Sequence, residues 1–286
     1  MPRYLTSSMV SSYDSCPRGY EFWYEKRLRP NMGKAALKFG SAVHKGVEAA
    51  FVGSERPGLF FLSAWEAIKE QNIKYPKRQD WTKLRDIGLA MFPKLVASIR
   101  KRNIKLIAHP EKRLRAVFGD PFNIILQGWL DVIVEMDIPK SDLAYVRPKA
   151  RKGITGAVVV PDAKTAARSY DPGLVNIDEQ LTFYALLAKY DLGLDVDFVA
   201  FIVLTKQVDP KVEWHYATRT EEDFKALAAK VVRIKRDIEA GLFPDKSFKT
   251  FHCPSFCDFY PVCTRGDEAM DQFHVEPWPK RKSEVK

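Results

Sequence analysis

The chain has 286 residues, which is enough for one large domain or two small ones with a buried core. Its 46 Lys and Arg outnumber 36 Asp and Glu, and the formal net charge of +10 indicates a polyanionic partner, most simply nucleic acid. No apolar run is long enough to span a bilayer, and residues 1–10 lack the apolar core of a signal peptide, so a cytoplasmic protein that does not bind membranes is expected.

The first part of the chain predicts helices. Ser7 or Ser8 can cap a short helix that carries Cys16, and a longer helix is expected from Phe39 to Phe51. His44 and Glu48 lie four residues apart, on one face of that longer helix. Glu48 is either a hydrogen-bond acceptor behind His44 or a solvated charge. Gly40 and Gly46 in the same helix indicate close approach of another backbone.

The rest of the chain alternates between helices and strands. Residues 59–105 predict two or three helices that form an arm beside the core, and a long basic connection covers residues 139–155. Strands are expected at 112–118, 124–136, 156–162, 198–205 and 211–217, with helices at 176–192 and 221–241.

Two of these strands carry charges where apolar residues are expected. Asp162 and Lys164 follow three valines, and Asp131 follows a second apolar segment. Residues two apart in a strand share a face, so Asp162 and Lys164 point the same way, and Asp131 can join them from a neighbouring strand. Because an unpaired buried carboxylate costs several kcal/mol, by rough estimate, this convergence predicts a site for a hard divalent cation.

The four cysteines form a second candidate centre. Cys253, Cys257 and Cys263 lie close together in sequence, and Cys16 lies near the other end of the chain. Disulfides are rare in a reducing compartment, and four thiolates suit tetrahedral zinc or an iron–sulfur cubane. A shared centre would join the two ends of the chain, whereas the alternative is four unrelated small residues.

The motifs together resemble the RecB-like branch of the PD-(D/E)XK nuclease superfamily. The segment Gly40-Ser41-Ala42-Val43-His44 is similar to its Gly-x-x-x-His helix, and Gly128-Trp129-Leu130-Asp131 to its Gly-x-x-Asp strand. Pro161-Asp162-Ala163-Lys164 is similar to the acidic-x-Lys hallmark, and Gln180 with Tyr184 to the Gln-x3-Tyr helix. The one-plus-three cysteine pattern resembles the iron–sulfur subtype of AddB nuclease domains and CRISPR-adaptation nucleases, although three residues rather than two separate Cys253 from Cys257.

The resemblance implies an α/β fold with a restriction-endonuclease-like mixed central sheet flanked by helices, closed by a cysteine-bound metal centre that joins the N- and C-terminal ends. One nuclease domain is expected over residues 1–275, with the helical arm at about 55–105. The cysteine centre draws on 1–30 and 245–270, and residues 276–286 form a basic disordered tail.

The resemblance also implies roles for individual residues. Mg²⁺ or Mn²⁺ would be held by His44, Asp131, Asp162 and the Ala163 carbonyl, and Lys164 would act on the attacking water with help from Gln180 and Tyr184. Cys16, Cys253, Cys257 and Cys263 would hold a cluster, expected to be 4Fe-4S, with zinc as the alternative. Nucleic-acid contacts are expected from a basic set: Arg147, Lys149, Arg151, Lys152 and Arg168.

The function predicted is metal-dependent DNA cleavage, by an exonuclease acting on ends or single strands in recombination, repair or phage replication. No nucleotide-binding Gly-x4-Gly-Lys loop is present, so any helicase or recombination partner would be a separate protein. Three alternatives stay open. They are a CRISPR-adaptation nuclease, a non-catalytic nucleic-acid-binding protein organised by metal, and a cysteine hydrolase that uses one of the clustered cysteines with His252. Polarity, strand preference, DNA against RNA, the number of metal ions and the oligomeric state are not determined by these patterns.

Overall fold

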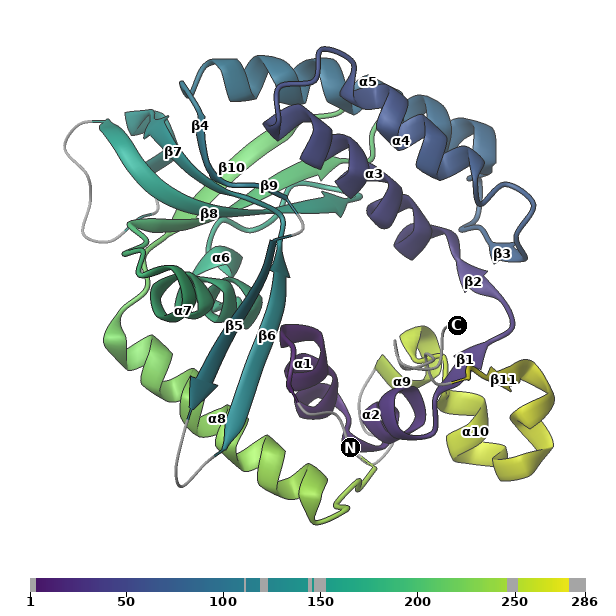
Figure 1. Cartoon of the computed structure of the whole chain (residues 1–286). Coiled ribbons are helices and arrows are strands. Elements are labelled where there is room, and N and C mark those ends of the chain that lie inside the picture. Colours follow the sequence, from purple (N-terminus) through teal and green to yellow (C-terminus); the bar gives the residue numbers. More distant parts are fainter. Residues whose placement is uncertain are drawn as a thin grey trace, which may run out of the picture.

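The computed structural model describes residues 4–110, 112–118, 123–143, 146, 153–245 and 252–277, without the side chains of residues 252 and 255. A mixed sheet with helices on both faces forms the centre of this part of the chain (Figure 1). The α/β mixed-sheet prediction is therefore confirmed.

The central sheet has five strands in the order β10-β9-β8-β7-β4. They are β4 (Lys105–Ala108), β7 (Ile133–Ile138), β8 (Ile154–Ala166), β9 (Phe198–Thr205) and β10 (Val212–Ala217). Strands β8 and β9 pair in parallel, and the other neighbours pair antiparallel. A parallel pair needs a crossover, which α6 (Leu174–Ile177) and α7 (Glu179–Leu192) provide. Every residue of β9 is buried, as expected for a strand covered on both faces.

Two apolar cores lie on opposite faces of this sheet. One lies against α3 (Ala35–Phe51), α4 (Pro57–Glu66) and α5 (Trp81–Arg100). The other lies against α1 (Ser7–Ser15), α7 and α8 (Glu221–Glu239). The helices predicted as an arm at 59–105 thus pack over one face of the sheet. Gly46 is required there, because an added Cβ would lie 2.2 Å from the Phe92 ring, whereas Gly40 has room for one.

A separate antiparallel ribbon joins the second core. Strands β5 (Lys112–Phe118) and β6 (Ile124–Leu130) pair along their whole length, and Leu5 bridges to Leu126 beside them. The inward face of the ribbon packs against α7 and α1 (Figure 1). The expected strand at 124–136 is therefore two strands in two different sheets, and the chain changes direction at Asp131.

The two ends of the described chain lie together (Figure 1). Strand β1 (Leu28–Pro30) pairs antiparallel with β11 (Phe273–Val275), and Phe22 and Phe259 complete a small core there. Glu276, in the predicted tail, forms ion pairs with Arg27 and Arg29. The remaining short elements are α2 (Pro17–Tyr20), a π-helical turn (Glu21–Glu25), the parallel pair β2 (Gly33–Lys34) and β3 (Ile73–Lys74), a 3-10 turn (Lys140–Leu143), α9 (His252–Phe256), α10 (Tyr260–Arg265) and a 3-10 helix (Gly266–Gln272).

Candidate active site

Asp162 and Lys164 occupy successive positions on the face of β8 that looks toward α7. The Asp162 carboxylate oxygen Oδ2 lies 2.5 Å from the Lys164 ammonium Nζ, and Asp162 is only 3% exposed. The strand runs from Ile154 to Ala166, further than the apolar pattern at 156–162 indicated. Parallel pairing with β9 continues through Asp162 and Lys164, so the backbone holds both side chains in a fixed register.

Asp131 reaches the same place from the break between β6 and β7. Its Oδ2 atom lies 3.1 Å from Nδ1 of His44, which projects from α3. The neighbouring Val43 and Val47 are buried against the sheet, which orients α3 so that His44 faces the end of the ribbon. The structure therefore brings together His44 from α3, Asp131 from the break between β6 and β7, and Asp162 and Lys164 from β8.

The charges of these groups perturb one another. Burial raises the pKa of Asp162 to about 6, and the negative charge of Asp131 adds to this effect, while Lys164 opposes it. Burial by itself would lower the pKa of His44, but the adjacent Asp131 carboxylate outweighs burial and raises it. Lys164 behaves in the same way, since the Asp162 carboxylate outweighs burial and raises the pKa of the ammonium.

Two carboxylate oxygens at this site can accept further hydrogen bonds or bind a cation. Oδ2 of Asp131 and Oδ2 of Asp162 are both buried and make no hydrogen bond of normal geometry, although each has a base within ion-pair distance. No three His, Cys, Asp or Glu side chains within the described residues are close enough to enclose a metal ion by themselves. Mg²⁺ commonly takes one or two carboxylates and completes its shell with water and substrate phosphate. The donor set therefore fits such a hard cation.

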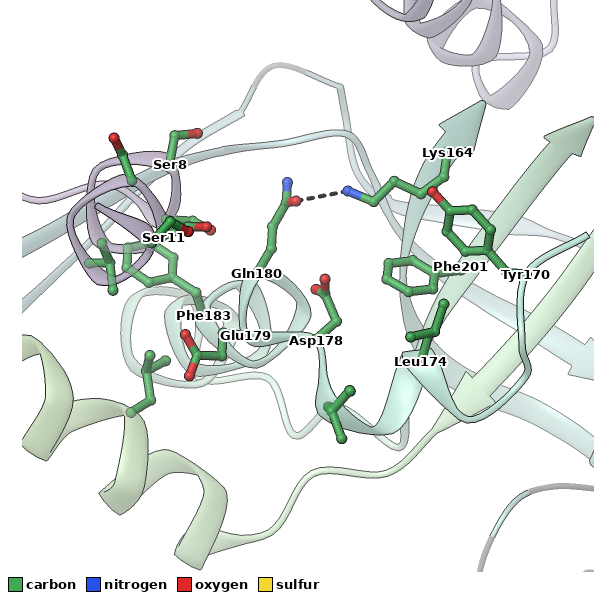
Figure 2. A pocket seen from close by; sticks show the side chains of 16 residues that line it. Ser8, Ser11, Lys164, Tyr170, Leu174, Asp178, Glu179, Gln180, Phe183 and Phe201 are labelled. Carbon is green, nitrogen blue, oxygen red and sulfur yellow. Dashed lines mark hydrogen bonds between the residues drawn. The ribbon is translucent and has the colours of Figure 1, made fainter. Parts of the chain in front are cut away.

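Helix α7 supplies a hydrogen-bonded chain behind the lysine. Lys164 Nζ donates to Gln180 Oε1 at 2.8 Å (Figure 2). Gln180 Nε2 in turn donates to the Tyr184 hydroxyl at 3.3 Å. Asp178 caps this helix by accepting from the Leu181 N–H, which fixes where the helix begins. Burial raises the pKa of Tyr184 to about 12, so its hydroxyl stays protonated at neutral pH.

Two further residues line a cavity of about 370 Å³ with Leu130 and Asp131. Glu48 projects into it from α3 and pairs with Lys45 at 3.0 Å, and Trp129 borders it from β6. The four-residue spacing from His44 is the sequence signal for Glu48. Trp129 lies inside the Gly-x-x-Asp segment, but no sequence pattern indicated that its side chain lies at the site.

The cysteines gather at the joined chain ends. Cys16, Cys253 and Cys257 line one cavity of about 480 Å³, and none of the four cysteines forms a disulfide. Cys263 packs with Cys257 against the small core at the joined ends, and burial raises the pKa of its thiol to about 11.

Most of the residues predicted to contact nucleic acid are not among those that the structure describes. Arg147, Lys149, Arg151 and Lys152 lie outside the described residues. Arg168 is exposed in the turn after β8. The Ala163 backbone lies between Asp162 and Lys164 in the sheet, and coordination of an ion by its carbonyl stays a prediction.

A mixed sheet with two carboxylates and a lysine at a strand break defines a class of phosphodiester-cleaving enzymes. The chain belongs to the PD-(D/E)XK nuclease superfamily, whose family model matches residues 4–264. Its fold is similar to the crystal structure of a candidate exonuclease from Eubacterium rectale, with a TM-score of 0.51 and 14% sequence identity. That similarity covers 98% of this chain and 91% of the other. No curated protein matches the sequence. In the part of the chain that the structure describes, no helix combines the length and apolar character needed to cross a membrane.

Proposed function

We propose that this protein is a cytoplasmic, divalent-metal-dependent deoxyribonuclease of the RecB-like branch, and that it acts as an exonuclease on DNA ends or single strands in recombination, repair or phage replication. The observation that carries the proposal is the convergence of Asp131, Asp162 and Lys164, with two buried carboxylate oxygens left unsatisfied. A non-catalytic binding protein would have no need for a buried ion pair of this kind, which is costly to desolvate. A CRISPR-adaptation nuclease remains the alternative within the same class, and its genomic neighbours would distinguish it.

Each residue has a distinct task in this proposal. Asp131, Asp162, His44 and the Ala163 carbonyl would hold Mg²⁺ or Mn²⁺, which when bound supplies a Lewis acid and a water of lowered pKa. Lys164 would orient the attacking water and offset negative charge on the phosphate as it becomes pentacoordinate. Gln180 holds the ammonium of Lys164 in place, and Tyr184 holds the amide of Gln180.

The test is a nuclease assay on end-labelled single-stranded and duplex DNA with Mg²⁺ or Mn²⁺. We expect cleavage by the native protein, and its loss in Asp131→Asn and Asp162→Asn with DNA binding largely kept, because surface cations rather than these carboxylates carry affinity. The exposed Asp209→Asn is the control. Near-native cleavage by either site variant would overturn the assignment.

We further propose that Cys16, Cys253, Cys257 and Cys263 hold a 4Fe-4S cluster. Three of the cysteines, Cys16, Cys253 and Cys257, line one cavity, and Cys263 packs with Cys257 against the adjoining small core, which supports a shared centre. Four thiolates suit a cubane, and zinc bound by four thiolates is the alternative. Iron and sulfide analysis of protein purified without oxygen tests the proposal, and zinc without iron would refute it.

A further inference from the structure

Trp129 is a large aromatic side chain that is exposed to solvent next to the candidate active site. It is 48% exposed and lies two residues before Asp131, where it lines the same cavity as Asp131 and Glu48. Single exposed apolar residues are common on protein surfaces. The position of this one, beside a reacting carboxylate, is what requires an explanation.

The alternation of β6 forces this side chain outward. Gly128 faces α7, where an added Cβ would lie 2.9 Å from Leu187, and Leu130 is buried on the same inward face. Trp129 between them must project to the opposite face. In the described part of the chain, no residue accepts a hydrogen bond from its indole N–H and no aromatic ring packs on it. The ring is therefore available to a ligand.

Positive charge lies directly beside the ring. Arg113 on β5 is the cross-strand partner of Trp129, so the two side chains share the outward face of the ribbon. Arg115 follows on that face, and both arginines are exposed. An aromatic face next to guanidinium groups suits a nucleotide, because the base can stack on the ring while the arginine contacts the phosphate.

The candidate active-site groups border this cavity and a second one. Lys164 and Gln180 line the second cavity, of about 760 Å³, which the serine face of α1 borders (Figure 2). Asp131 belongs to the first cavity and Lys164 to the second, with Asp162 adjoining Lys164. A strand whose phosphate lies at these groups would place neighbouring nucleotides in the two cavities.

We propose that Trp129 stacks on the base of a nucleotide adjoining the scissile phosphate of single-stranded nucleic acid, and that Arg113 contacts the phosphate beside it. Inside an intact duplex both faces of each base are covered by neighbouring bases, so stacking on the indole ring favours an unpaired base. This inference rests on the proposed function and adds to it a preference for single strands and the residue that carries the preference.

The first test measures binding of short labelled oligothymidylates, each with one abasic site, in buffer without divalent cations so that no strand is cut. For the native protein, we expect one abasic position to weaken binding by about tenfold. Trp129→Ala should weaken binding of the intact strand by a similar factor. In this variant, an abasic site at the same position should cause no further loss of affinity. Trp129→Phe should keep most of both effects. Val117→Ala, on the same outward face of the ribbon and 64% exposed, is the matched control.

A second arm separates stacking from general binding. Trp129→Ala should leave binding to a relaxed, covalently closed circular duplex unchanged, because that duplex has neither ends nor unpaired bases. Arg113→Gln should reduce the log–log salt slope of single-strand binding by the equivalent of about one phosphate contact. If Trp129→Ala fails to fold, Trp129→Leu keeps apolar bulk without the ring and takes its place. An abasic penalty that persists in the folded variant, or no penalty at any position in the native protein, overturns the proposal.

A parallel cleavage assay with Mg²⁺ or Mn²⁺ keeps this proposal separate from the nuclease assignment. If the native protein does not cut but its abasic penalty depends on Trp129, the nuclease assignment fails and the stacking site stands. If the native protein cuts and Trp129→Ala cuts intact and abasic strands with the native ratio of rates, the stacking site fails and the nuclease assignment stands.

Discussion

At the scale of single residues, the central fact is a buried carboxylate whose charge is only partly compensated. Asp162 lies beside Lys164, but Asp131 is close enough to raise the pKa of Asp162 further. Two carboxylates that lie this close together favour a cation that can bind both. The same arrangement that costs stability in the empty protein therefore stabilises the bound state.

We predict that Mn²⁺ raises the melting temperature of the native protein and leaves that of Asp131→Asn and Asp162→Asn almost unchanged. A ligand that binds the folded state at 100 times its Kd stabilises it by about 2.7 kcal/mol. Differential scanning fluorimetry across a Mn²⁺ series measures the shift, with Ca²⁺ and Mg²⁺ in parallel. If either variant shows the full rise in melting temperature with Mn²⁺, its carboxylate is not a ligand of the ion.

Gln180 acts on the phosphate only through Lys164, which makes it a positioning residue. Gln180→Ala should lower kcat by about 10- to 100-fold and change KM little, because a misplaced ammonium loses alignment rather than substrate affinity. Gln207→Ala, on an exposed turn, is the matched control. Steady-state kinetics on end-labelled DNA decide the matter, and a rise in KM with native kcat would contradict this role.

At the scale of elements, the contact between the ribbon and α7 sets the position of Asp131. Gly128 allows β6 to lie close to Leu187 and Tyr184 on α7. Tyr184 also ends the hydrogen-bonded chain from Lys164, so one helix face supports both carboxylate and lysine. The distance between ribbon and helix thus controls the geometry of the site.

Gly128→Ala should destabilise the protein by about 1–3 kcal/mol and reduce cleavage, because the new methyl group overlaps Leu187. Leu187→Ala creates a cavity by itself, but in the double variant it makes room for the methyl group. Urea unfolding of the native protein, the two single variants and the double variant measures the coupling free energy between the two positions. Strictly additive losses would show that β6 does not press on α7 at this point.

At the scale of the whole molecule, the chain ends are joined by protein contacts as well as by the gathered cysteines. Phe22 packs on Phe259, with ring centroids 5.3 Å apart, and Arg27 pairs with Glu276 at 2.7 Å. These contacts hold residues that are about as far apart in sequence as the chain allows. Loss of the metal centre that we propose for the cysteines should therefore weaken the junction without separating it.

Phe273→Ala should lower the free energy of unfolding by about 3 kcal/mol, since it removes a buried ring from a small core. Val275→Ala on the same strand is 64% exposed and should change it by less than about 0.5 kcal/mol. Urea denaturation of both variants measures the difference. Equal effects would show that the terminal strand pair contributes little.

The net charge of +10 predicts that DNA binding weakens with salt. Neutralising Arg147, Lys149, Arg151 and Lys152 together should flatten the log–log slope for single strands by up to about 3. Arg100→Gln with Lys101→Gln is the control pair. Arg102 beside them is unsuitable, because it is 7% exposed and bound to Asp142. An unchanged slope would place the DNA elsewhere.

Local patterns in the sequence predicted much of this molecule. Strands 112–118 and 198–205 agree with the structure at both ends, because period-two and continuous apolar patterns report directly on burial. The pairing of Asp162 with Lys164 follows from strand geometry alone. The resemblance of short motifs indicated the nuclease superfamily, which the family model then confirmed.

Other features depend on contacts between distant segments, which local patterns do not encode. The break at Asp131 divides one apolar run between two sheets, because the ribbon must leave the central sheet to pack on α7. The exposure of Trp129 follows from the inward packing of its two neighbours. The sequence by itself thus determined which residues are candidates for the chemistry, since charge and periodicity are local properties. Only the tertiary structure decided which of them meet, because burial and approach depend on elements far apart in the chain.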